Sequence, residues 1–318
     1  MIVATGRVPS IVEEILGRFG PIRALDAPDE ESLAAAVRDA AALLARGSAK
    51  ISARVIEAGR NLRVIGRSGV GYDTVDVAAA TARGIPVVYT PGASTRVVAE
   101  GALAMILALV KRLPDLDRRT KAGDWAVRET FAVRDLEGSV LGIVGLGRIG
   151  SEVARLALPF GMQVLASDPL VASEQAERLG VSLVNLDRLL AEPDVVSLHA
   201  PLEAGTRGLI DRKRLNQMKP GAILVNLGRG GLLESLDALQ EALNSGRLAA
   251  AGLDVFPQEP PDVSHPVFSH PNLLASPHAL GLTAGAARRI FSMVSQDMAA
   301  VLEGRRPEHV VNPEVFAR

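Results

Sequence analysis

The sequence predicts an α/β protein made of two doubly wound parallel-sheet domains with a cleft between them. Short apolar runs alternate with longer segments of helical periodicity, a pattern typical of βαβ units. Two of these apolar runs lead into glycine-rich loops, at residues 66–71 and 145–150. The length of 318 residues also suits two domains of ordinary size.

The strands and helices can be placed along the chain. Strands of the first sheet are expected at residues 2–5, 41–45, 62–65 and 86–89, with helical spacing at 29–39 and 74–83. Strands of the second sheet are expected at residues 140–144, 163–167, 195–198, 222–227, 250–255 and 273–276. Residues 97–137 separate the two series and combine an apolar helix near 98–112 with a polar arm that carries Trp125. A last helix at 284–303 is expected to return to the first domain.

The composition argues against several classes of protein. The net charge is −1, so no basic excess indicates binding to nucleic acid or to an anionic membrane. The longest apolar stretch, residues 101–110, is about half as long as a membrane span requires. The first residues show no signal-peptide pattern. Cysteine is absent, which excludes disulfides and thiolate metal sites and fits a cytoplasmic location.

Residues 145–150 form a G-x-G-x-x-G motif between the expected strand 140–144 and a helical pattern at 149–158. In that context Gly145 permits a tight turn, Gly147 lets a pyrophosphate approach the backbone, and Gly150 allows close helix packing. The helix N-terminus adds free N–H groups and partial positive charge. Asp168 follows about 20 residues later, where a carboxylate binds the adenosine ribose and repels a 2′-phosphate. The motif therefore predicts NAD as the cofactor.

Three charged side chains come just after expected strands of the second sheet, namely Arg229, Glu259 and His278. Ligands bind at the carboxyl ends of strands in open α/β sheets. An imidazole suits proton transfer near neutral pH, a neighbouring carboxylate orients it, and a guanidinium can bind a substrate carboxylate. Position therefore predicts His278 as the acid–base group for hydride transfer between an alcohol and nicotinamide. Asp254, at the same sheet edge, could bind the nicotinamide carboxamide.

The other histidines are weaker candidates for the acid–base group. His199 ends a buried strand, where it is expected to bond to backbone near the cofactor, and it is the second candidate for the acid–base group. His265 and His270 lie in a proline-rich loop without the spacing or the cysteines of a metal site, and His309 lies near the end of the sequence. We therefore expect no metal.

With these residues in place, the sequence resembles the D-isomer-specific 2-hydroxyacid dehydrogenases over essentially its whole length. The matching motifs are highly specific in combination. They are GRSGVGYDTVD (66–76), ARGIPVVYTPG (82–92), VAEGALAMILALVKRLP (98–114), VLGIVGLGRIG (140–150), VVSLHAPLEAGTRGLI (195–210), MKPGAILVNLGRGGLL (218–233), AGLDVFPQEP (251–260) and SPHALGLT (276–283).

The resemblance implies a flavodoxin-like substrate domain at 1–96 plus 285–318 and a Rossmann NAD-binding domain at 97–284. It implies that Arg229 binds the substrate carboxylate and carbonyl, that His278 is the acid–base group, and that Glu259 is its partner. Backbone amides of Val70 and Gly71 would hold the substrate carboxylate. The implied NAD contacts are Gly145, Gly147, Arg148, Ile149, Gly150, Asp168, Ala200, Leu227, Asp254 and Gly281.

The substrate is less closely defined. Ser94 stands where many relatives have asparagine beside the active site. Arg46 and Arg67 follow expected strands and should point toward the cleft, and Arg128 lies in the arm. In relatives that use 3-phosphoglycerate, basic residues near these places bind the phosphate, whereas the alternative for each is a solvated surface arginine. The set favours a second anionic group but does not separate phosphoglycerate from hydroxypyruvate or glyoxylate.

These observations predict an NAD-dependent D-2-hydroxyacid dehydrogenase that interconverts a small 2-hydroxy acid and a 2-oxo acid, with D-3-phosphoglycerate as one candidate substrate. A hydroxypyruvate or glyoxylate reductase is the alternative among enzymes, and a non-catalytic NAD-sensing corepressor-like protein is the alternative outside them. Trp125 and the apolar helix also predict a homodimer built on residues 98–137, in which Arg128 could reach the partner's active site.

Overall fold

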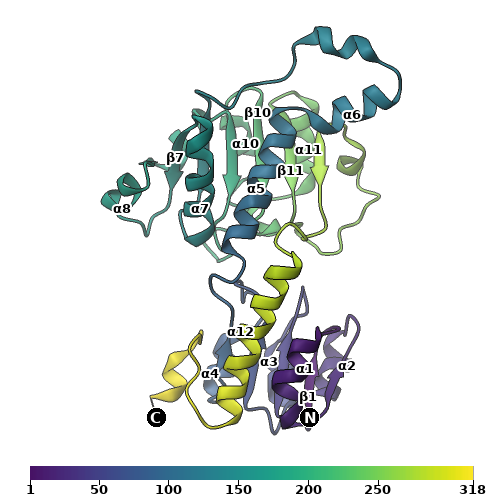
Figure 1. The fold of residues 1–318 in the computed structure, drawn as a ribbon, viewed down its shortest axis with the longest axis vertical. Coiled ribbons are helices and arrows are strands. Elements are labelled where there is room, and N and C mark those ends of the chain that lie inside the picture. The colour runs from purple at the N-terminus through teal and green to yellow at the C-terminus, as the bar shows by residue number, and fades with distance from the viewer. Residues whose placement is uncertain (318) are drawn as a thin grey trace. The chain divides into compact units, whose positions relative to one another are not determined.

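A computed structural model describes residues 1–317. The chain divides into two compact units, Met1–Ser94 with Leu282–Arg318, and Thr95–Gly281 (Figure 1). Each unit contains one sheet, and every pairing between the named strands is parallel. The predicted fold class, α/β with two doubly wound parallel sheets, is confirmed.

The sheet of the first unit has the strand order β2-β1-β3-β4-β5, which is the flavodoxin-like order. Its strands are β1 (Ile2–Ala4), β2 (Ile22–Ala24), β3 (Ala42–Ala45), β4 (Val64–Arg67) and β5 (Val87–Val88). Successive residues of a strand face opposite sides, so Val3 joins one buried cluster while Ile2 and Ala4 join the other. The helices divide between the same two faces of the sheet. One face is covered by α1 (Ser10–Leu16) and α12 (Ala284–Leu302), and the other by α2 (Glu30–Ala36), α3 (Ala53–Ala58) and α4 (Val77–Ala82).

Helix α12 packs directly on the centre of this sheet. A Cβ on Gly66 of β4 would lie 2.3 Å from Met298 Sδ and 2.9 Å from Val294 Cγ2. Only a glycine therefore allows the helix to approach the strand this closely. Thr283 begins the helix, because its hydroxyl accepts a hydrogen bond from the Ala286 amide at 3.1 Å.

The second unit has a seven-stranded sheet of order β12-β11-β10-β9-β6-β7-β8, which contains the Rossmann order with one added strand. Its strands are β6 (Val140–Val144), β7 (Gln163–Ser167), β8 (Ser182–Leu183), β9 (Val195–Leu198), β10 (Ala222–Asn226), β11 (Leu248–Leu253) and β12 (Leu273–Ala275). One face is covered by α5 (Thr95–Val110), α7 (Arg148–Ala157) and α8 (Ser173–Arg178), the other by α9 (Leu186–Ala191), α10 (Arg212–Gln217) and α11 (Leu236–Asn244).

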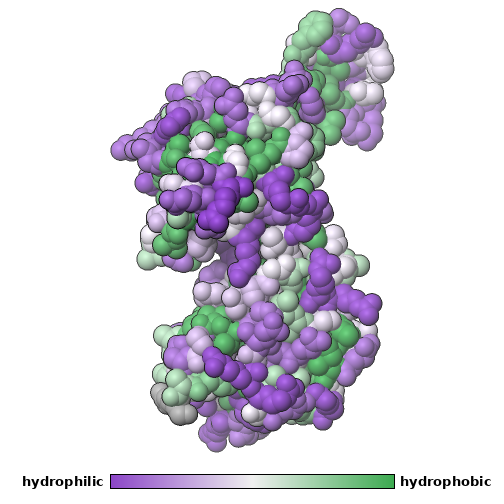
Figure 2. All heavy atoms as spheres, turned by 60° about the vertical axis from the view of Figure 1, so that its left-hand side comes forward, coloured by the Kyte–Doolittle hydropathy of each residue, from purple (hydrophilic) through white to green (hydrophobic). Residues whose placement is uncertain are grey.

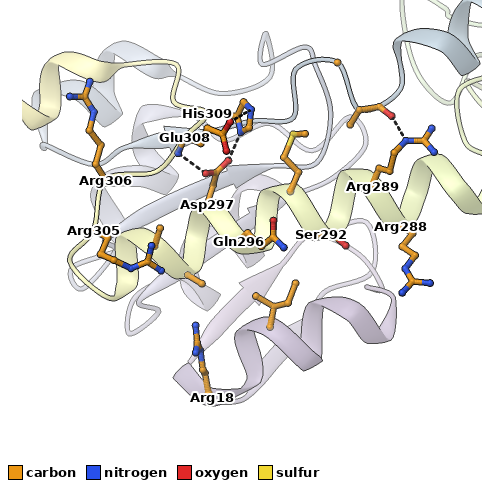
Figure 3. Close-up of a pocket in the computed structure, with 16 residues that line it drawn as sticks. Arg18, Arg288, Arg289, Ser292, Gln296, Asp297, Arg305, Arg306, Glu308 and His309 are labelled. Atoms are coloured by element: carbon orange, nitrogen blue, oxygen red, sulfur yellow. Dashed lines mark hydrogen bonds and ion pairs between the residues drawn. The ribbon is translucent and has the colours of Figure 1, made fainter.

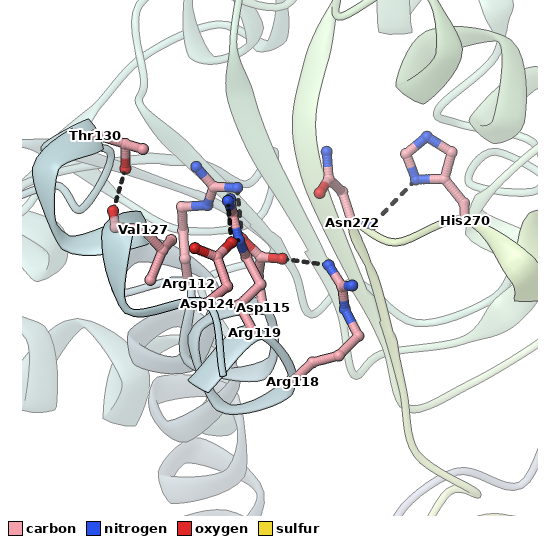
Figure 4. Close-up of polar contacts among 9 residues, drawn as sticks. All are labelled: Arg112, Asp115, Arg118, Arg119, Asp124, Val127, Thr130, His270 and Asn272. Carbon is pink, nitrogen blue, oxygen red and sulfur yellow. Dashed lines mark hydrogen bonds and ion pairs between the residues drawn. The ribbon is translucent and has the colours of Figure 1, made fainter. Parts of the chain in front are cut away.

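The arm of the second unit consists of α6 (Leu113–Lys121) and a 3-10 turn, Trp125–Thr130, and Figure 1 shows it projecting beyond the sheet. The sequence predicts a polar segment here but gives no sign of helix α6. Ion pairs along α6, such as Arg118 with Asp115 at 2.5 Å, hold its charged side chains (Figure 4). Hydrophobic atoms also reach the surface of this projection (Figure 2), and Trp125 and Phe131 are 68% and 85% exposed.

Two expected strands are displaced by two residues. The strand expected at 62–65 is Val64–Arg67, because the Leu62 amide bonds the Gly59 carbonyl in a turn. The strand expected at 250–255 is Leu248–Leu253, where the register with β10 shifts between Ala222 and Ile223. Edge strands β2 and β8 were missed because their partly exposed side chains form no apolar run. Among the described residues, each helix is too short or too polar to cross a membrane.

Candidate active site

The glycine-rich loop connects β6 to α7 and is shaped by close backbone contacts. A Cβ on Gly145 would lie 2.7 Å from the Ala200 amide nitrogen, and one on Gly150 would lie 2.1 Å from the Gly145 carbonyl oxygen. At Gly147, the residue that precedes α7, a Cβ would meet no described atom within 4 Å. The loop is therefore tightly packed underneath and open at the helix N-terminus, as a phosphate cradle requires.

Asp168 follows β7 and supports this loop. Its Oδ2 accepts a hydrogen bond from the Leu146 amide at 2.8 Å, and its Oδ1 accepts one from the Leu170 amide at 2.9 Å. A carboxylate has about four acceptor positions, so two backbone bonds leave capacity for ribose hydroxyls. The sequence predicted the ribose role for Asp168 but not the bond to Leu146, which joins the two halves of the dinucleotide site.

The acid–base candidates lie at the ends of three neighbouring strands. Arg229 follows β10, Glu259 follows β11, and His278 follows β12. His278 Nδ1 lies 2.9 Å from Glu259 Oε2, and the other carboxylate oxygen accepts a hydrogen bond from the Phe256 amide at 3.1 Å. The His278 side chain is 50% exposed and that of Glu259 is 26% exposed. The geometry leaves His278 Nε2 for exchange of a proton with a ligand.

Glu259 stays ionised beside this ring. Burial raises the pKa of Glu259, but the hydrogen bond and charge of His278, the Phe256 amide and the charge of Arg229 together hold it below its usual value. An ionised carboxylate favours the protonated imidazole and fixes its orientation. The arrangement can therefore donate a proton and take it back.

Gly230 allows two of the three active-site segments to meet. A Cβ on Gly230 would lie 1.9 Å from the carbonyl carbon of Phe256 and 2.4 Å from the Pro257 nitrogen. The segment that carries Arg229 is thus pressed against the segment that leads to Glu259. Gly230 lies inside the NLGRGG motif that contains Arg229, but the sequence alone does not show that this position needs a glycine.

Asp254 organises the loop that carries His278. The carboxylate is 3% exposed, and its Oδ1 accepts hydrogen bonds from the Ser276 hydroxyl at 2.6 Å and the Ala279 amide at 3.0 Å. Oδ2 accepts one from the Leu280 amide at 3.3 Å. His278 between them has a left-handed backbone, with φ of 54°. Asp254 and Ser276 therefore hold the loop in a conformation that a non-glycine residue rarely adopts.

The remaining cofactor candidates lie along the same unit. Arg148 and Ile149 begin α7, and the backbone of Ala200 packs under Gly145. Leu227 and Gly281 lie against α5. A Cβ on Gly101 of this helix would be 3.5 Å from Leu227 Cδ2. A Cβ on Gly281 would be 2.7 Å from Cγ2 of Val98, which also belongs to α5. All of them belong to the unit that contains the dinucleotide loop.

The other histidines have their own partners. The His199 amide donates to the Val144 carbonyl at 2.7 Å, and its ring Nε2 lies 2.8 Å from the Ser197 hydroxyl. Part of His199 reaches the surface, but its Nδ1 is buried without a described partner, and burial lowers its pKa to about 4. His265 lies beside Asp237, and His270 accepts from the Asn272 amide at 3.2 Å (Figure 4). Residues 1–317 contain no group of three metal-binding side chains.

The candidate substrate-binding arginines of the first unit contact other residues of that unit. The Arg46 guanidinium lies 4.9 Å from the centre of the Phe291 ring, and burial lowers its pKa. Arg67 donates from Nε to the Gly71 carbonyl at 2.9 Å, so it restrains the loop that contains Val70 and Gly71. In the other unit, Arg128 of the arm lies 3.1 Å from Glu129.

A Rossmann sheet, a dinucleotide loop and a His–Glu pair at the same sheet edge define a dinucleotide-binding protein equipped for proton transfer. Residues 103–279 match the family model described as D-isomer specific 2-hydroxyacid dehydrogenase, NAD binding domain. Because this match covers more than half of the chain, the protein belongs to the D-isomer specific 2-hydroxyacid dehydrogenase family. The predicted family and the predicted NAD cofactor are thereby confirmed.

Individual relatives agree with this assignment. The chain is 41% identical over 271 residues to a D-3-phosphoglycerate dehydrogenase of Archaeoglobus fulgidus, a match that covers 85% of this chain and 51% of that protein. It is 40% identical to a glyoxylate reductase of Korarchaeum cryptofilum, covering 91% and 87% of the two chains. The structure resembles that of the TT0316 protein from Thermus thermophilus, with a TM-score of 0.90, 36% identity and coverage of 98% and 99%. The chain spans about half the length of the phosphoglycerate dehydrogenases it matches.

Proposed function

We propose that the chain is an NAD-dependent D-2-hydroxyacid dehydrogenase that interconverts a small 2-hydroxy acid and the corresponding 2-oxo acid. The observation that carries the proposal is the 2.9 Å pair between His278 Nδ1 and Glu259 Oε2, next to the strand end that bears Arg229. This pair lies at the edge where an α/β sheet binds ligands and, unlike in the other described histidine–carboxylate pairs, the ring nitrogen Nε2 has no described partner. The second unit is proposed as the NAD-binding domain and the first as the substrate domain.

The proposed roles follow from the geometry. The loop at 145–150 and Asp168 would hold NAD, which would supply the hydride acceptor for the 2-hydroxy acid and, as NADH, the hydride donor for the 2-oxo acid. Protonated His278 gives the Nε2 proton to the substrate carbonyl oxygen during reduction, and neutral His278 takes it back during oxidation. Glu259 stabilises the protonated ring, and Arg229 holds the substrate carboxylate through paired hydrogen bonds. Val70, Gly71, Arg46 and Arg67 remain proposed substrate contacts of the first unit.

A steady-state assay with NADH tests this proposal. The purified chain should oxidise NADH in the presence of at least one of glyoxylate, hydroxypyruvate and phosphohydroxypyruvate, and NADPH should be a poorer cofactor. If NADH binds but none of the three acids is reduced, the proposed activity is wrong. That result would favour the non-catalytic, NAD-sensing alternative.

The choice of acid separates two candidate activities. The phosphoglycerate dehydrogenases among the relatives support D-3-phosphoglycerate. The bond from Arg67 Nε to the Gly71 carbonyl gives this arginine a role in the loop that needs no phosphate, which supports the alternative, a hydroxypyruvate or glyoxylate reductase. Replacement of Arg67 by alanine distinguishes them: loss of a phosphate contact raises KM for phosphohydroxypyruvate more than for glyoxylate, whereas loss of loop support affects both acids alike.

We also propose a homodimer that buries the arm. Beside the exposed Trp125 and Phe131, a cavity of about 350 Å³ is lined by Leu116, Val127 and Val133. Exposed aromatic side chains next to an apolar hollow are typical of protein interfaces. Sedimentation should give a dimer for the native chain and a monomer for Trp125→Glu, and a native monomer at micromolar concentration would contradict the proposal. We propose the cytoplasm as the location, which the cysteine-free sequence supports.

A further inference from the structure

Helix α5 contains a buried glycine in its second turn, where helix propensity favours almost any other residue. Gly101 lies well inside the helix, which runs over Thr95–Val110. Glycine in a helix interior is less favourable than alanine, because its backbone loses more conformational freedom on folding. A buried glycine at this position therefore indicates that a neighbouring segment lies too close to the helix for a side chain.

That neighbouring segment is the loop that carries His278. A Cβ on Gly101 would lie 2.7 Å from Leu280 Cβ and 3.2 Å from the Leu280 carbonyl oxygen. Val98, three residues earlier on the same face of the helix, packs on the loop as well, since a Cβ on Gly281 would lie 2.7 Å from Val98 Cγ2. The segment that follows His278 is thus pressed against the first two turns of α5.

The helix side of this contact is held in place. Arg96, in the first turn of α5, pairs with Glu152 of α7 at 2.9 Å. The chain just before α5 is bound too, because Arg289 Nε donates a hydrogen bond to the Ala93 carbonyl at 3.0 Å (Figure 3). A side chain added to the helix at this contact would therefore displace the loop.

The loop would pass such a displacement on to His278. Leu280 is the second residue after His278. The amides of Ala279 and Leu280 donate to the Asp254 carboxylate at 3.0 and 3.3 Å. His278 has a φ of 54°, a conformation that persists in a non-glycine residue only where the surroundings enforce it. A shift of Leu280 by several tenths of an ångström would strain the bonds that enforce it.

We propose that Gly101 is a positioning residue for His278. By leaving room for Leu280, it lets α5 form the surface against which the acid–base loop is set. Gly101 acts through the loop and contacts neither substrate nor cofactor in this account. The effect on turnover rests on the proposed dehydrogenase function, whereas the placement of the His278 ring can be measured without turnover.

Replacement of Gly101 by alanine in the full chain tests the proposal. We expect kcat for reduction to fall at least about tenfold, because a displacement near 1 Å can cost about 100-fold, while the dissociation constant of NADH stays the same. Gly142→Ala is the matched control. A Cβ there would lie 2.7 Å from Pro193 Cγ and 3.2 Å from the Leu189 carbonyl oxygen, on the opposite face of the same sheet. This control should leave kcat close to the native value.

A second substitution shows whether the contact with Leu280 is the cause. Leu280→Gly removes the Cβ that Gly101→Ala would meet. In the Leu280→Gly background, Gly101→Ala should therefore no longer lower kcat. A native kcat for Gly101→Ala alone, or an equal loss of kcat in both backgrounds, would overturn the proposal.

Imidazole NMR spectra follow the His278 ring whether or not the chain turns over. The His278 signals, assigned with His278→Gln, should move in Gly101→Ala and keep their native positions in Gly142→Ala. Moved signals in a chain that reduces none of the tested acids would support the role of Gly101 and contradict only the proposed activity. Unmoved signals in Gly101→Ala would overturn the proposal, with or without turnover.

Discussion

Gly230 meets the backbone of Phe256 so closely that a Cβ would lie 2.0 Å from the Phe256 carbonyl oxygen. This contact joins the segment that follows β10 to the segment that follows β11. The first segment carries Arg229, the proposed anion binder, and the second leads to Glu259, the proposed partner of His278. The distance between these two residues therefore depends on a residue without a side chain.

Replacement of Gly230 by alanine should push these two segments apart. We expect a fall in kcat of about 100-fold, because a displacement near 1 Å is enough to lose that much, and a loss of stability of about 1–3 kcal/mol from overpacking. Turnover and urea denaturation measure the two effects. Gly205→Ala is the control, since its Cβ would meet no described atom within 4 Å. Equal kcat for the two variants would contradict this account of Gly230.

Ser276 should act as a positioning residue for His278. Ser276→Ala removes the 2.6 Å bond to Asp254 and with it about 0.5–1.5 kcal/mol of support for the His278 loop. We expect kcat to fall several-fold while the dissociation constant of NADH stays the same, and Ser276→Thr should restore activity. Ser264→Ala, which removes a hydroxyl bonded to Asp262 on an exposed loop, is the control. A lower stability with unchanged kcat would show that Ser276 only supports the fold.

Asp168 should set both the affinity for NADH and the preference over NADPH. Asp168→Ala removes the acceptor of the Leu146 amide, and bonds to charged groups contribute about 1.5–3 kcal/mol. The dissociation constant of NADH should rise at least about tenfold, and that of NADPH should rise less because a repulsive carboxylate is gone. Calorimetry with both cofactors measures this, with Asp187→Ala on α9 as the control. A native protein that already prefers NADPH would contradict the assignment.

His199 should make the fold sensitive to mild acid. Its pKa is lowered from about 6.5 to about 4 by burial, so between these values the unfolded chain binds a proton that the folded chain does not. Its contribution is therefore fully present above pH 6.5 and lost as the pH falls toward 4, by up to about 3 kcal/mol. Urea midpoints at pH 7 and pH 4.5 should differ less for His199→Gln than for the native chain or for His270→Gln. An equal difference in all three would contradict this role.

Most strands could be predicted because their apolar runs are continuous, and the three candidate residues follow such runs within a few positions. Arg229, Glu259 and His278 come together because their strands are neighbours in the sheet. The bond between Asp168 and Leu146 could not be predicted, because it depends on how two loops pack after folding. The same holds for Gly230, whose need for a bare backbone appears only when Phe256 lies against it.

The solvent exposure of their side chains explains why some elements could not be predicted from the sequence. Strands β2 and β8 lie at sheet edges and expose part of their side chains, so they lack the continuous apolar run that marks β6 or β9. Helix α6 is held by local ion pairs and has no buried residue, so periodicity of apolar residues could not indicate it. Apolar periodicity in the sequence indicates which segments are buried. It does not indicate exposed edge strands or a helix that is stabilised by ion pairs.

The central claim is that His278 transfers the proton and that Glu259 holds its ring in place through the 2.9 Å contact with Nδ1. The most direct test is the pH dependence of kcat for reduction in the native chain, Glu259→Gln and His278→Gln. The native rate should fall as pH rises because reduction uses a proton from His278, and Glu259→Gln should lower kcat because the ring loses the carboxylate that holds Nδ1. His278→Gln should lose about 10²–10⁴-fold in kcat while NADH binding is unchanged. A His278→Gln protein with near-native kcat and the native pH profile would contradict the claim.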